Sequence, residues 1–504
     1  MTNWTDVAFR APGVTVSAKH HAAAAAGNAV VAAEAERTLL ATLARPVGAA
    51  DRPTHLLLKA AAGAGKSYAL KRLIVAAAGA PGTRRIGVTA FTNNQIRPLA
   101  TGLAEQLGRD RVCLHLSADA AANLPAGVAS AVTVSTTGTA IPPRADVVVA
   151  TASKLKAPGE TGRLKNHLGE TADGHLFDVL FVDEAWQLPH HLFDALRDVA
   201  PVVVGVGDVG QLPPLEIGDN PWRGDARHNP YRAWPTAFTG QPATWERELP
   251  AVWRPAGEAL GLWRAFYPTW SELHSVAAPG DRRVRLHADV ASSPLWAQVG
   301  SGAPTLLEVS GLPDSEAPDV DLPLTERLES WLDDLFTAGF TVESQRYGDD
   351  GAPLGELDEE RPGECDDRDP LVVVLATRNQ AVDDATEMVE RLRARHGLRE
   401  RDLVASTVDS WQGRTNALTV AVHPLSGATG LDEFNSAFGR LAVACTRATH
   451  GLLVLARDGL DDLLASAPAR PGTPFGEPGV RQLPRQTHQR IVSTFTRATV
   501  NLSE

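Results

Sequence analysis

Residues 179–187 read Val-Leu-Phe-Val-Asp-Glu-Ala-Trp-Gln, so an apolar run ends in two adjacent carboxylates, Asp183 and Glu184. An uninterrupted apolar run of this kind is typical of an interior strand in a parallel sheet. In open α/β sheets, ligands bind at the carboxyl ends of such strands. The acidic pair therefore predicts an α/β fold with a binding site at the end of this strand.

A glycine-rich stretch upstream supplies the partner of the acidic pair. After a short apolar run, residues 60–67 read Ala-Ala-Ala-Gly-Ala-Gly-Lys-Ser and lead into a helical pattern. A strand, a glycine loop and a helix start in this order bind phosphates through backbone N–H groups, with Gly63 and Gly65 in the loop. We expect Lys66 to face the β- and γ-phosphates and the Ser67 hydroxyl to bind Mg²⁺.

Each half of this pattern alone has a plainer explanation. Ala60 stands where the loop normally has its first glycine, and an Asp-Glu pair is by default a solvated surface feature. The two halves nevertheless occur in the expected order, each after a predicted strand. Together they favour a site for a nucleoside triphosphate, in which Asp183 holds Mg²⁺ and Glu184 deprotonates the attacking water.

The composition is that of a globular chain with room for two or three domains, since it has 504 residues, of which 43% are hydrophobic. Cys113, Cys365 and Cys445 are too far apart for a metal clip or a disulfide framework, which favours the reducing cytoplasm. No run of about 18 apolar residues occurs, so we expect no membrane span. The net charge of -12 argues against a surface coated by nucleic acid but allows a local basic groove.

Two blocks of the chain alternate short apolar runs with helical patterns, which predicts two parallel sheets covered by helices. Only the first block carries a glycine loop, so we expect the second block to supply parts to the same nucleotide. An acidic stretch within the second block, residues 348–369, is expected to be a loop. The expected segments are an Ala-rich helical lead-in (1–50), a first domain (51–215), a Trp- and Arg-rich helical connector (216–290), a second domain (291–465) and a weakly basic tail (466–504).

Tryptophans concentrate in the expected connector. Seven of the 11 lie between Trp222 and Trp296, interleaved with arginines, and such a mixture binds single-stranded nucleic acid by stacking and charge. Packing of the connector onto the two blocks explains the same pattern and is the favoured interpretation for each of these rings except Trp253. Core packing is also expected for Trp411, which lies in the second block.

Short polar motifs adjoin predicted strands in both blocks. In the first block, Gln211 follows a strand near the acidic pair, where an amide can hold the γ-phosphate or the attacking water. In the second block, residues 407–414 read Thr-Val-Asp-Ser-Trp-Gln-Gly-Arg and residues 438–448 read Phe-Gly-Arg-Leu-Ala-Val-Ala-Cys-Thr-Arg-Ala. Polar groups are therefore expected at strand ends in both sheets.

Taken as a set, these motifs resemble those of superfamily 1 helicases, and within them the 5′-to-3′ branch that includes the nonsense-mediated-decay RNA helicase and its DNA-acting relatives. The resemblance covers about residues 60–448 through motifs in the family's order, with unmatched segments between them. It implies a P-loop NTPase with two RecA-like parallel-sheet domains in tandem. It also implies ATP and Mg²⁺ as ligands and single-stranded DNA or RNA as partner.

The resemblance implies a role for several named residues. Residues 249–254 read Leu-Pro-Ala-Val-Trp-Arg, and here the Trp253 ring is implied to lie against the adenine and Arg254 to reach the γ-phosphate. Arg447 is implied to be a second arginine at the γ-phosphate, and Gln412 to contact the nucleotide. The implied nucleic-acid contacts are Thr92, Asn93, Thr151, Arg378 and Thr407.

Three positions depart from the family's pattern. The family usually carries a glutamine upstream of the glycine loop that reads adenine, but the first glutamine here is Gln95, so weak discrimination between ATP and GTP is expected. Thr415 stands where the family has a glutamate, which implies a weaker ribose contact or weaker coupling to the strand. Ala442 stands where this branch prefers asparagine.

The favoured function is an ATP-dependent helicase or translocase on single-stranded nucleic acid, on DNA more than RNA, moving 5′-to-3′. The alternative is a nucleotide-gated nucleic-acid-binding subunit of a larger complex, which would have a protein partner and no unwinding activity. Strand displacement distinguishes the two functions, because a clamp would displace nothing.

Overall fold

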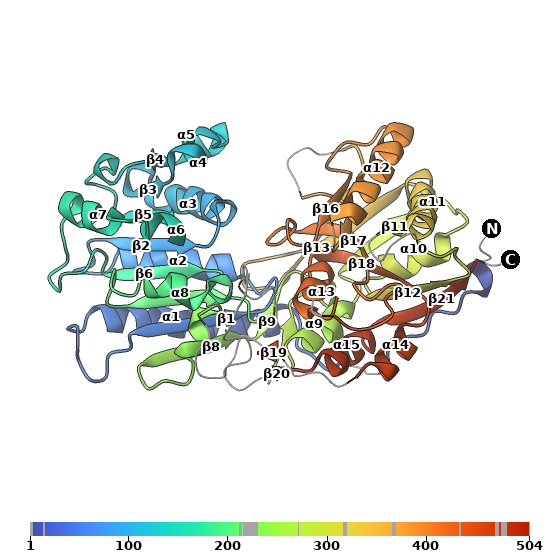
Figure 1. Cartoon of the computed structure of the whole chain (residues 1–504), viewed down its shortest axis with the longest axis horizontal. Helices are drawn as coiled ribbons and strands as arrows, with labels where there is room; N and C mark the ends of the chain where they lie inside the picture. The colour runs from blue at the N-terminus through green and yellow to red at the C-terminus, as the bar shows by residue number, and fades with distance from the viewer. Residues whose placement is uncertain are drawn as a thin grey trace.

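The computed structural model describes residues 4–13, 16–210, 214, 230–270, 272–315, 320–364, 369–377, 379–432, 435–468, 473–474 and 481–502. Two α/β units lie side by side and meet through a smaller central region (Figure 1). Each unit is built around one parallel sheet, which forms because apolar strands alternate with helices along the chain.

The first unit contains eight strands. They are β1 (His55–Ala60), β2 (Ile86–Ala90), β3 (Val112–His115), β4 (Thr133–Ser135), β5 (Val147–Thr151), β6 (Val179–Asp183), β7 (Val203–Gly207) and β8 (Thr244–Leu249). All pair in parallel, in the order β4-β3-β5-β2-β6-β7-β1-β8. The helices of this unit are α1 (His21–Leu43), α2 (Lys66–Ala78), α3 (Asn93–Leu107), α4 (Ala118–Ala122), α5 (Ala126–Ala131), α6 (Ala152–Leu155), α7 (Glu160–Leu168) and α8 (His190–Asp194).

The second unit contains six parallel strands. They are β12 (Thr305–Ser310), β15 (Val372–Ala376), β16 (Leu403–Thr407), β17 (Asn416–Val422), β18 (Ala448–Arg457) and β21 (Thr496–Asn501), in the order β16-β15-β17-β18-β12-β21. The helices of this unit are α10 (Ser293–Gly300), α11 (Leu322–Ala338), α12 (Asn379–His396), α13 (Phe438–Cys445), α14 (Leu460–Ser466) and α15 (Pro484–Val492).

Short elements complete the chain. These are helix α9 (Leu260–Phe266) and strands β9 (Ala251–Val252), β10 (His274–Ser275), β11 (Arg282–Leu286), β13 (Phe340–Tyr347), β14 (Pro353–Glu360), β19 (Thr473–Pro474) and β20 (Arg481–Gln482). The two large sheets confirm the predicted fold class, α/β with two RecA-like parallel-sheet domains in tandem.

Both sheets recruit a strand from outside the expected domain bodies. The connector was predicted to be helical, but its described residues contain the strands β8 to β11 besides the short helix α9, because β8 completes the first sheet. β8 pairs with β1, and β21, which belongs to the expected tail, pairs with β12. The acidic stretch 348–369 was expected to be a loop, but it contains β14, which pairs antiparallel with β13. β14 is mostly exposed, so it lacks the apolar alternation by which a strand is recognised in a sequence.

The N-terminal lead-in contacts both domains. Trp4 packs edge-on against Trp331 of α11, with ring centroids 5.5 Å apart. The Arg10 and Arg497 backbones exchange two hydrogen bonds of 2.8 and 2.9 Å, so this segment lies along β21 of the second domain. Helix α1 then packs against α2 and β8 of the first domain, and the lead-in thus spans the junction.

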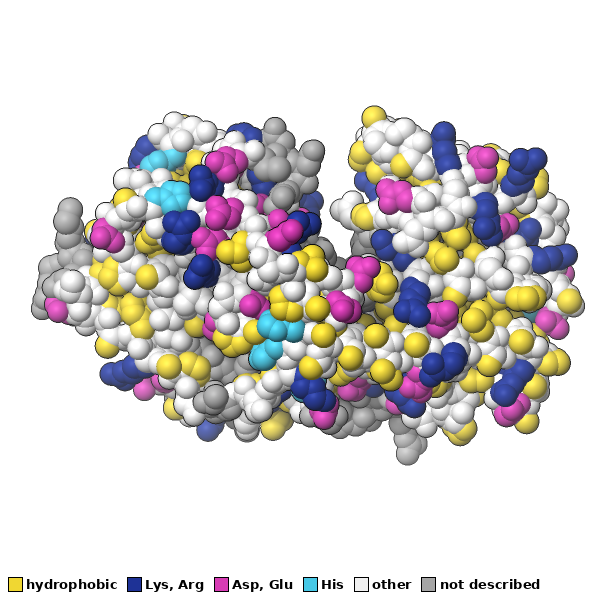
Figure 2. Space-filling view, turned by 180° about the vertical axis from the view of Figure 1, so that it is seen from behind, with side chains coloured by type: hydrophobic (Ala, Val, Ile, Leu, Met, Phe, Trp, Pro, Cys, Tyr) yellow, Lys and Arg dark blue, Asp and Glu magenta, His cyan; other side chains and the backbone are white. Residues whose placement is uncertain are grey.

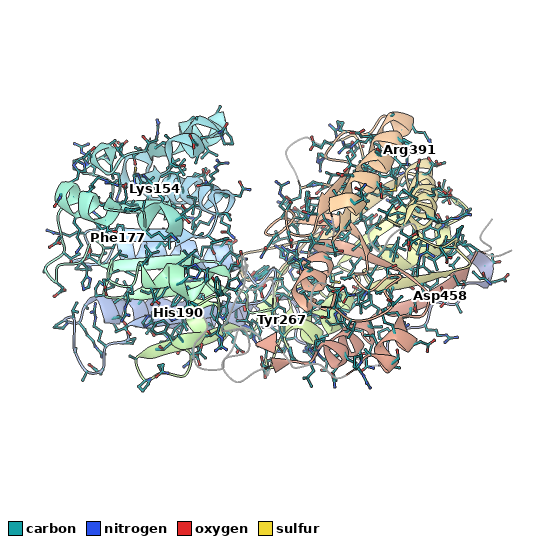
Figure 3. All side chains as sticks on the ribbon, viewed as in Figure 1. Lys154, Phe177, His190, Tyr267, Arg391 and Asp458 are labelled. Atoms are coloured by element: carbon teal, nitrogen blue, oxygen red, sulfur yellow. The ribbon has the colours of Figure 1, made fainter. Side chains whose placement is uncertain are left out.

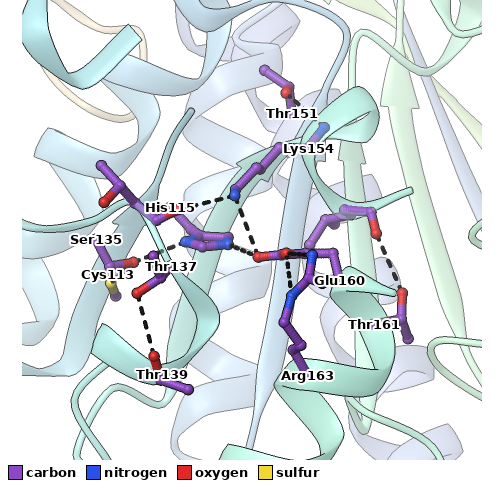
Figure 4. Close-up of polar contacts among 12 residues, drawn as sticks. Cys113, His115, Ser135, Thr137, Thr139, Thr151, Lys154, Glu160, Thr161 and Arg163 are labelled. Atoms are coloured by element: carbon purple, nitrogen blue, oxygen red, sulfur yellow. Dashed lines mark hydrogen bonds and ion pairs between the residues drawn. The ribbon is translucent and has the colours of Figure 1, made fainter. Parts of the chain in front are cut away.

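A buried polar cluster joins the ends of β3 and β4 to helix α7 (Figure 4). The His115 ring contacts the Ser135 hydroxyl through Nδ1 (2.9 Å) and the Glu160 carboxylate through Nε2 (2.7 Å). Burial would raise the pKa of Glu160, but hydrogen bonds from Arg163 and His115 and the charge of Lys154 lower it to about 2. Burial lowers the pKa of His115, so the neutral ring donates to Glu160 and accepts from Ser135.

Candidate nucleotide site between the two domains

The glycine loop connects the end of β1 to the start of α2, as the sequence predicts. Gly63 and Gly65 have φ values of 77° and 87°, a left-handed conformation that glycine adopts without strain. A β-carbon on Gly63 would also collide with the Arg254 side chain. The loop therefore needs glycine at Gly63 for two reasons, its backbone conformation and its close approach to Arg254.

The acidic pair lies beside this loop. β6 ends at Asp183, whose carboxylate accepts the Glu184 N–H (2.9 Å), and Glu184 itself adopts a left-handed φ of 49°. The Lys66 ammonium forms an ion pair with one Glu184 carboxylate oxygen, and the second oxygen is buried and has no hydrogen-bond partner among the described residues. The phosphate lysine and the candidate base thus contact each other directly.

The charges at this site perturb one another. Burial disfavours the charged form of Lys66, but the carboxylates of Glu184, Asp183 and Asp208 outweigh it and raise its pKa. Burial, reinforced by the Glu184 charge, raises the pKa of Asp183 to about 6. Burial also raises the pKa of Asp208 to about 6, although Lys66 opposes that rise. A partly buried lysine is therefore surrounded by three acidic groups.

Asp208 follows β7 and belongs to this group, although the sequence did not mark it as a site residue. Its carboxylate accepts the Gly210 N–H (2.8 Å) and the Tyr267 hydroxyl (2.9 Å). Tyr267 lies next to α9, at the junction of the two domains (Figure 3). Its hydroxyl accepts the N–H of Ala62 in the glycine loop (2.9 Å). No sequence signal separates Tyr267 from the other aromatic residues of the expected connector.

Two arginines lie near the acidic groups of this site. Arg254 follows β9 and donates to the Thr446 carbonyl of the second domain (3.1 Å). Arg447 is buried and donates to the Val443 carbonyl (3.0 Å) and to the Thr446 hydroxyl (2.8 Å). Burial, followed by the charge of Arg254, lowers the pKa of Arg447 to about 9, while Asp208 and Glu184 act in the opposite direction. The two guanidinium groups therefore lie within electrostatic reach of the acidic groups.

Trp253 lies against the glycine loop. The backbone N–H of Trp253 donates to the Gly63 carbonyl (2.7 Å). The Trp253 ring would lie 3.9 Å from a β-carbon on Gly65. Arg282 of β11 donates to the Trp253 carbonyl (2.8 Å) and to the Arg254 carbonyl, which fixes this segment. Because the ring is only partly buried, one part of it faces outward beside the loop.

An asparagine in α1 ties the loop to the same segment. The Asn28 amide donates to the Ala64 carbonyl (3.0 Å) and the Ala251 carbonyl (2.8 Å), and accepts the Ala251 N–H (2.9 Å). A lone amide in an Ala-rich helix is the one sequence signal that could have identified Asn28. Its partners are backbone atoms, which no side-chain pattern reveals.

The second domain brings Gln412 and Thr407 to the ends of its strands. In the part of the chain that the structure describes, the buried Gln412 amide nitrogen has no hydrogen-bond partner. The Thr407 hydroxyl accepts the Ser410 N–H (3.0 Å) and so closes a turn at the end of β16. Trp411 is buried and donates to Asn416 (3.0 Å), which confirms its predicted packing role.

The candidate nucleic-acid residues of the first domain lie at the carboxyl ends of β2 and β5. Thr92 caps α3, and its N–H donates to Gln95 (2.9 Å), whose amide donates to Gln187 (2.9 Å). Asn93 is the first residue of α3, and Thr151 caps α6 by accepting the Lys154 N–H (3.2 Å). Because the parallel strands end at one edge, these residues share that edge. Gln211 and Arg378 lie outside the described residues.

Ser67 and Asp183 offer the oxygen ligands that Mg²⁺ prefers. Ser67 is exposed in the first turn of α2, and Asp183 is a buried carboxylate at the end of β6. Ser67 follows Lys66 and Asp183 precedes Glu184 in the chain, and Lys66 and Glu184 are in contact. The two oxygen groups therefore lie in the same site, and their chemistry fits the ion. Within the described ranges, no helix is long and apolar enough to cross a membrane.

Neither protein-family models nor curated protein sequences match the chain. Among solved structures it is similar to the PRRSV helicase (14% identity, TM-score 0.36, 87% of this chain and 58% of that one). It is also similar to the arterivirus nonstructural protein 10 helicase with DNA (14%, 0.36, 86% and 65%). A third is the Mycobacterium smegmatis helicase Lhr bound to ssDNA and AMP-PNP (13%, 0.40, 82% and 45%).

The chain spans between 45% and 65% of the length of these three proteins. At such identities and TM-scores the likenesses carry no argument about this chain.

Proposed function

We propose that the chain is an ATP-driven helicase or translocase on single-stranded nucleic acid. The proposal depends on one observation, the proximity of Lys66, Glu184, Arg254 and Arg447 between the two domains. Each of the four stands in a separate motif of the resemblance, and the motif of Arg254 lies in the connector. This set of a phosphate lysine, a carboxylate base and two arginines is what phosphoryl transfer to water requires.

The Lys66 ammonium is paired with the Glu184 carboxylate. A triphosphate attracts the Lys66 ammonium more strongly than one carboxylate does, so binding frees Glu184. Its unpartnered carboxylate oxygen is then available to orient and deprotonate the attacking water. Mg²⁺ would be held by Ser67 and Asp183 and would neutralise phosphate charge.

The arginines connect the chemistry to movement. Arg254 contacts the glycine loop of the first domain and the Thr446 carbonyl of the second, and Arg447 belongs to the second domain. A γ-phosphate that draws both guanidinium groups inward would pull the domains together, and hydrolysis would release them. Alternating grip on a strand by Thr92, Asn93 and Thr151 in one domain and by Thr407 and Arg378 in the other would then produce translocation.

Base choice would depend mainly on Trp253, since no glutamine precedes the glycine loop. Stacking on an indole ring suits any purine, so we propose ATP as the main nucleotide with weak discrimination against GTP. The 5′-to-3′ direction, the preference for DNA and the cytoplasmic location are parts of the same proposal. They rest on the motif resemblance and the scattered cysteines.

The test is the rate of ATP hydrolysis with no polymer, with single-stranded DNA, with single-stranded RNA and with duplex, in the parent chain and in Lys66→Ala. We expect strong stimulation by a single strand, most by DNA, and no hydrolysis by Lys66→Ala, whose fold should be intact because Lys66 is a phosphate ligand and not a core residue. Hydrolysis by Lys66→Ala at the parent rate would show that the site is elsewhere.

A further inference from the structure

Helix α9 and the residue after it bind both backbone polar groups of Ala62 in the glycine loop. The Trp263 indole N–H donates to the Ala62 carbonyl (2.9 Å), and the Ala62 N–H donates to the Tyr267 hydroxyl (2.9 Å). All three residues are buried, so neither backbone group has water as an alternative partner. The position of the loop therefore depends on these two aromatic side chains.

The Tyr267 hydroxyl continues the hydrogen-bonded chain to Asp208. It lies 2.9 Å from each of the two Asp208 carboxylate oxygens, and its single proton is donated to one of them at a time. Burial and the Asp208 charge raise the pKa of Tyr267, so the hydroxyl keeps this proton. The Tyr267 ring also packs closely on the Gly210 backbone, because a β-carbon on Gly210 would collide with it.

The same helix contacts the second domain. Arg490 of α15 donates to the Ala265 carbonyl of α9 (3.0 Å). Helix α9 thus lies between the glycine loop and the second domain, and a shift of the loop must either break these contacts or move the helix.

We infer that Tyr267 is a positioning residue that joins the glycine loop and Asp208 into one unit and sets the rate of turnover more than the affinity for nucleotide. The inference rests on the proposed function. The Asp208 carboxylate acts electrostatically on Lys66, Arg254 and Arg447. Its position therefore determines how strongly it competes with the phosphates for these three cations.

Removing only the hydroxyl has two consequences. The Ala62 N–H is left buried without a partner, which loosens the loop. The Asp208 carboxylate loses a donor and is drawn toward Lys66, where it competes with the γ-phosphate in the transition state. The ring remains against Gly210, so the core is preserved.

Tyr267→Phe tests this, and Tyr347→Phe is a matched control. Tyr347 also donates to a carboxylate, that of Asp281 (2.6 Å), without contacting the loop. We expect hydrogen exchange in Tyr267→Phe to accelerate in the peptides that contain Ala62 and Gly210. We also expect kcat to fall about 10- to 100-fold with KM within about threefold, as for a small misplacement of reacting groups. The control should match the parent in both measurements.

Unchanged exchange in either peptide, or parent kcat in Tyr267→Phe, would overturn the inference. An equal fall in kcat for both variants would also do so, because the effect would then be general destabilisation. If the parent hydrolysed no nucleoside triphosphate, the proposed function would fail. The hydrogen-exchange measurement would still test whether Tyr267 joins the glycine loop to Asp208. Should Tyr267→Phe not fold, Asp208→Ala tests the same link from its other end: exchange at Ala62 must rise although nothing touching Ala62 has changed.

Discussion

At the scale of single residues, the contact between Lys66 and Glu184 decides how the site responds to substitution. In Glu184→Gln the lysine loses the one carboxylate that contacts it directly, so fewer negative charges compete with the phosphates for the ammonium. We expect this variant to bind Mg-ATP at least as tightly as the parent, to hydrolyse it far more slowly, and to hold single-stranded nucleic acid longer. Turnover and strand dissociation measured side by side test this, and equal turnover in both proteins would remove Glu184 from the role of base.

Trp253 gives a prediction about nucleotide choice. Its ring lies beside the glycine loop and would stack on any purine. We expect the parent to use GTP almost as well as ATP, and Trp253→Ala to raise KM for both nucleotides by similar factors. Steady-state kinetics with the two nucleotides measure this. A strong preference for ATP that survives Trp253→Ala would point to a backbone group that reads adenine.

The sequence predicted the charged residues of the site better than the groups that hold them. Lys66 and Glu184 stand in motifs whose spacing follows from phosphate chemistry, and the structure brings them into contact. Tyr267 and Asn28 bind backbone atoms of the loop across 205 and 36 residues of chain. Hydrogen bonds to backbone leave no pattern in the partner's sequence, which is why neither residue was predicted.

At the scale of secondary-structure elements, the cluster around Glu160 anchors α7 to the ends of β3 and β4. Glu160→Gln leaves Lys154 and Arg163 without their buried counter-charge and should lower the free energy of unfolding by about 3 kcal/mol at pH 7. Glu170→Gln, which breaks an exposed pair with Lys165, should cost less than about 1 kcal/mol. Denaturant unfolding of the three proteins provides the comparison.

The same cluster predicts a pH dependence. The pKa of Glu160 is about 2 in the folded chain and 4.5 ordinarily. The unfolded chain therefore takes up the proton first, and the stabilisation is complete above about pH 4.5 and is lost as the pH falls toward 2. The stability difference between the parent and Glu160→Gln should shrink over this range. A difference that grew on acidification would show that the carboxylate is not held ionised.

Strands differ in how well the sequence predicts them. β6 and β7 are buried throughout, so their unbroken apolar runs identify them. β8 and β21 are edge strands: β8 is mostly polar without alternation, and β21 alternates between buried and more exposed residues. Both join their sheets where the chain returns to an open edge. Long-range pairing of this kind depends on the whole fold and not on local preference.

At the scale of the whole molecule, the glycine loop belongs to the first domain and Arg447 to the second. Arg254 lies between them, against Gly63 on one side and the Thr446 carbonyl on the other. Basic and acidic side chains are interspersed on one face of the molecule, and a notch separates the two domains there (Figure 2).

We expect Arg254→Ala to bind ATP nearly as well as the parent but to hydrolyse it about 10³-fold more slowly, as for loss of an arginine finger. Arg247 lies on β8 and pairs with Glu34 of α1. Arg247→Ala is the control and should match the parent in single-turnover kinetics. Parent turnover in Arg254→Ala would contradict closure through this arginine.

ATP-driven movement along a single strand is tested most directly by strand displacement from partial duplexes that carry one 5′ tail or one 3′ tail. The parent is predicted to displace the labelled strand from the 5′-tailed substrate when ATP is present, while Glu184→Gln binds the same substrate and displaces nothing. Displacement from the 3′-tailed substrate alone would reverse the direction and leave the ATPase intact. Binding and ATP hydrolysis by the parent without displacement from either substrate would contradict the account and favour a nucleotide-gated clamp.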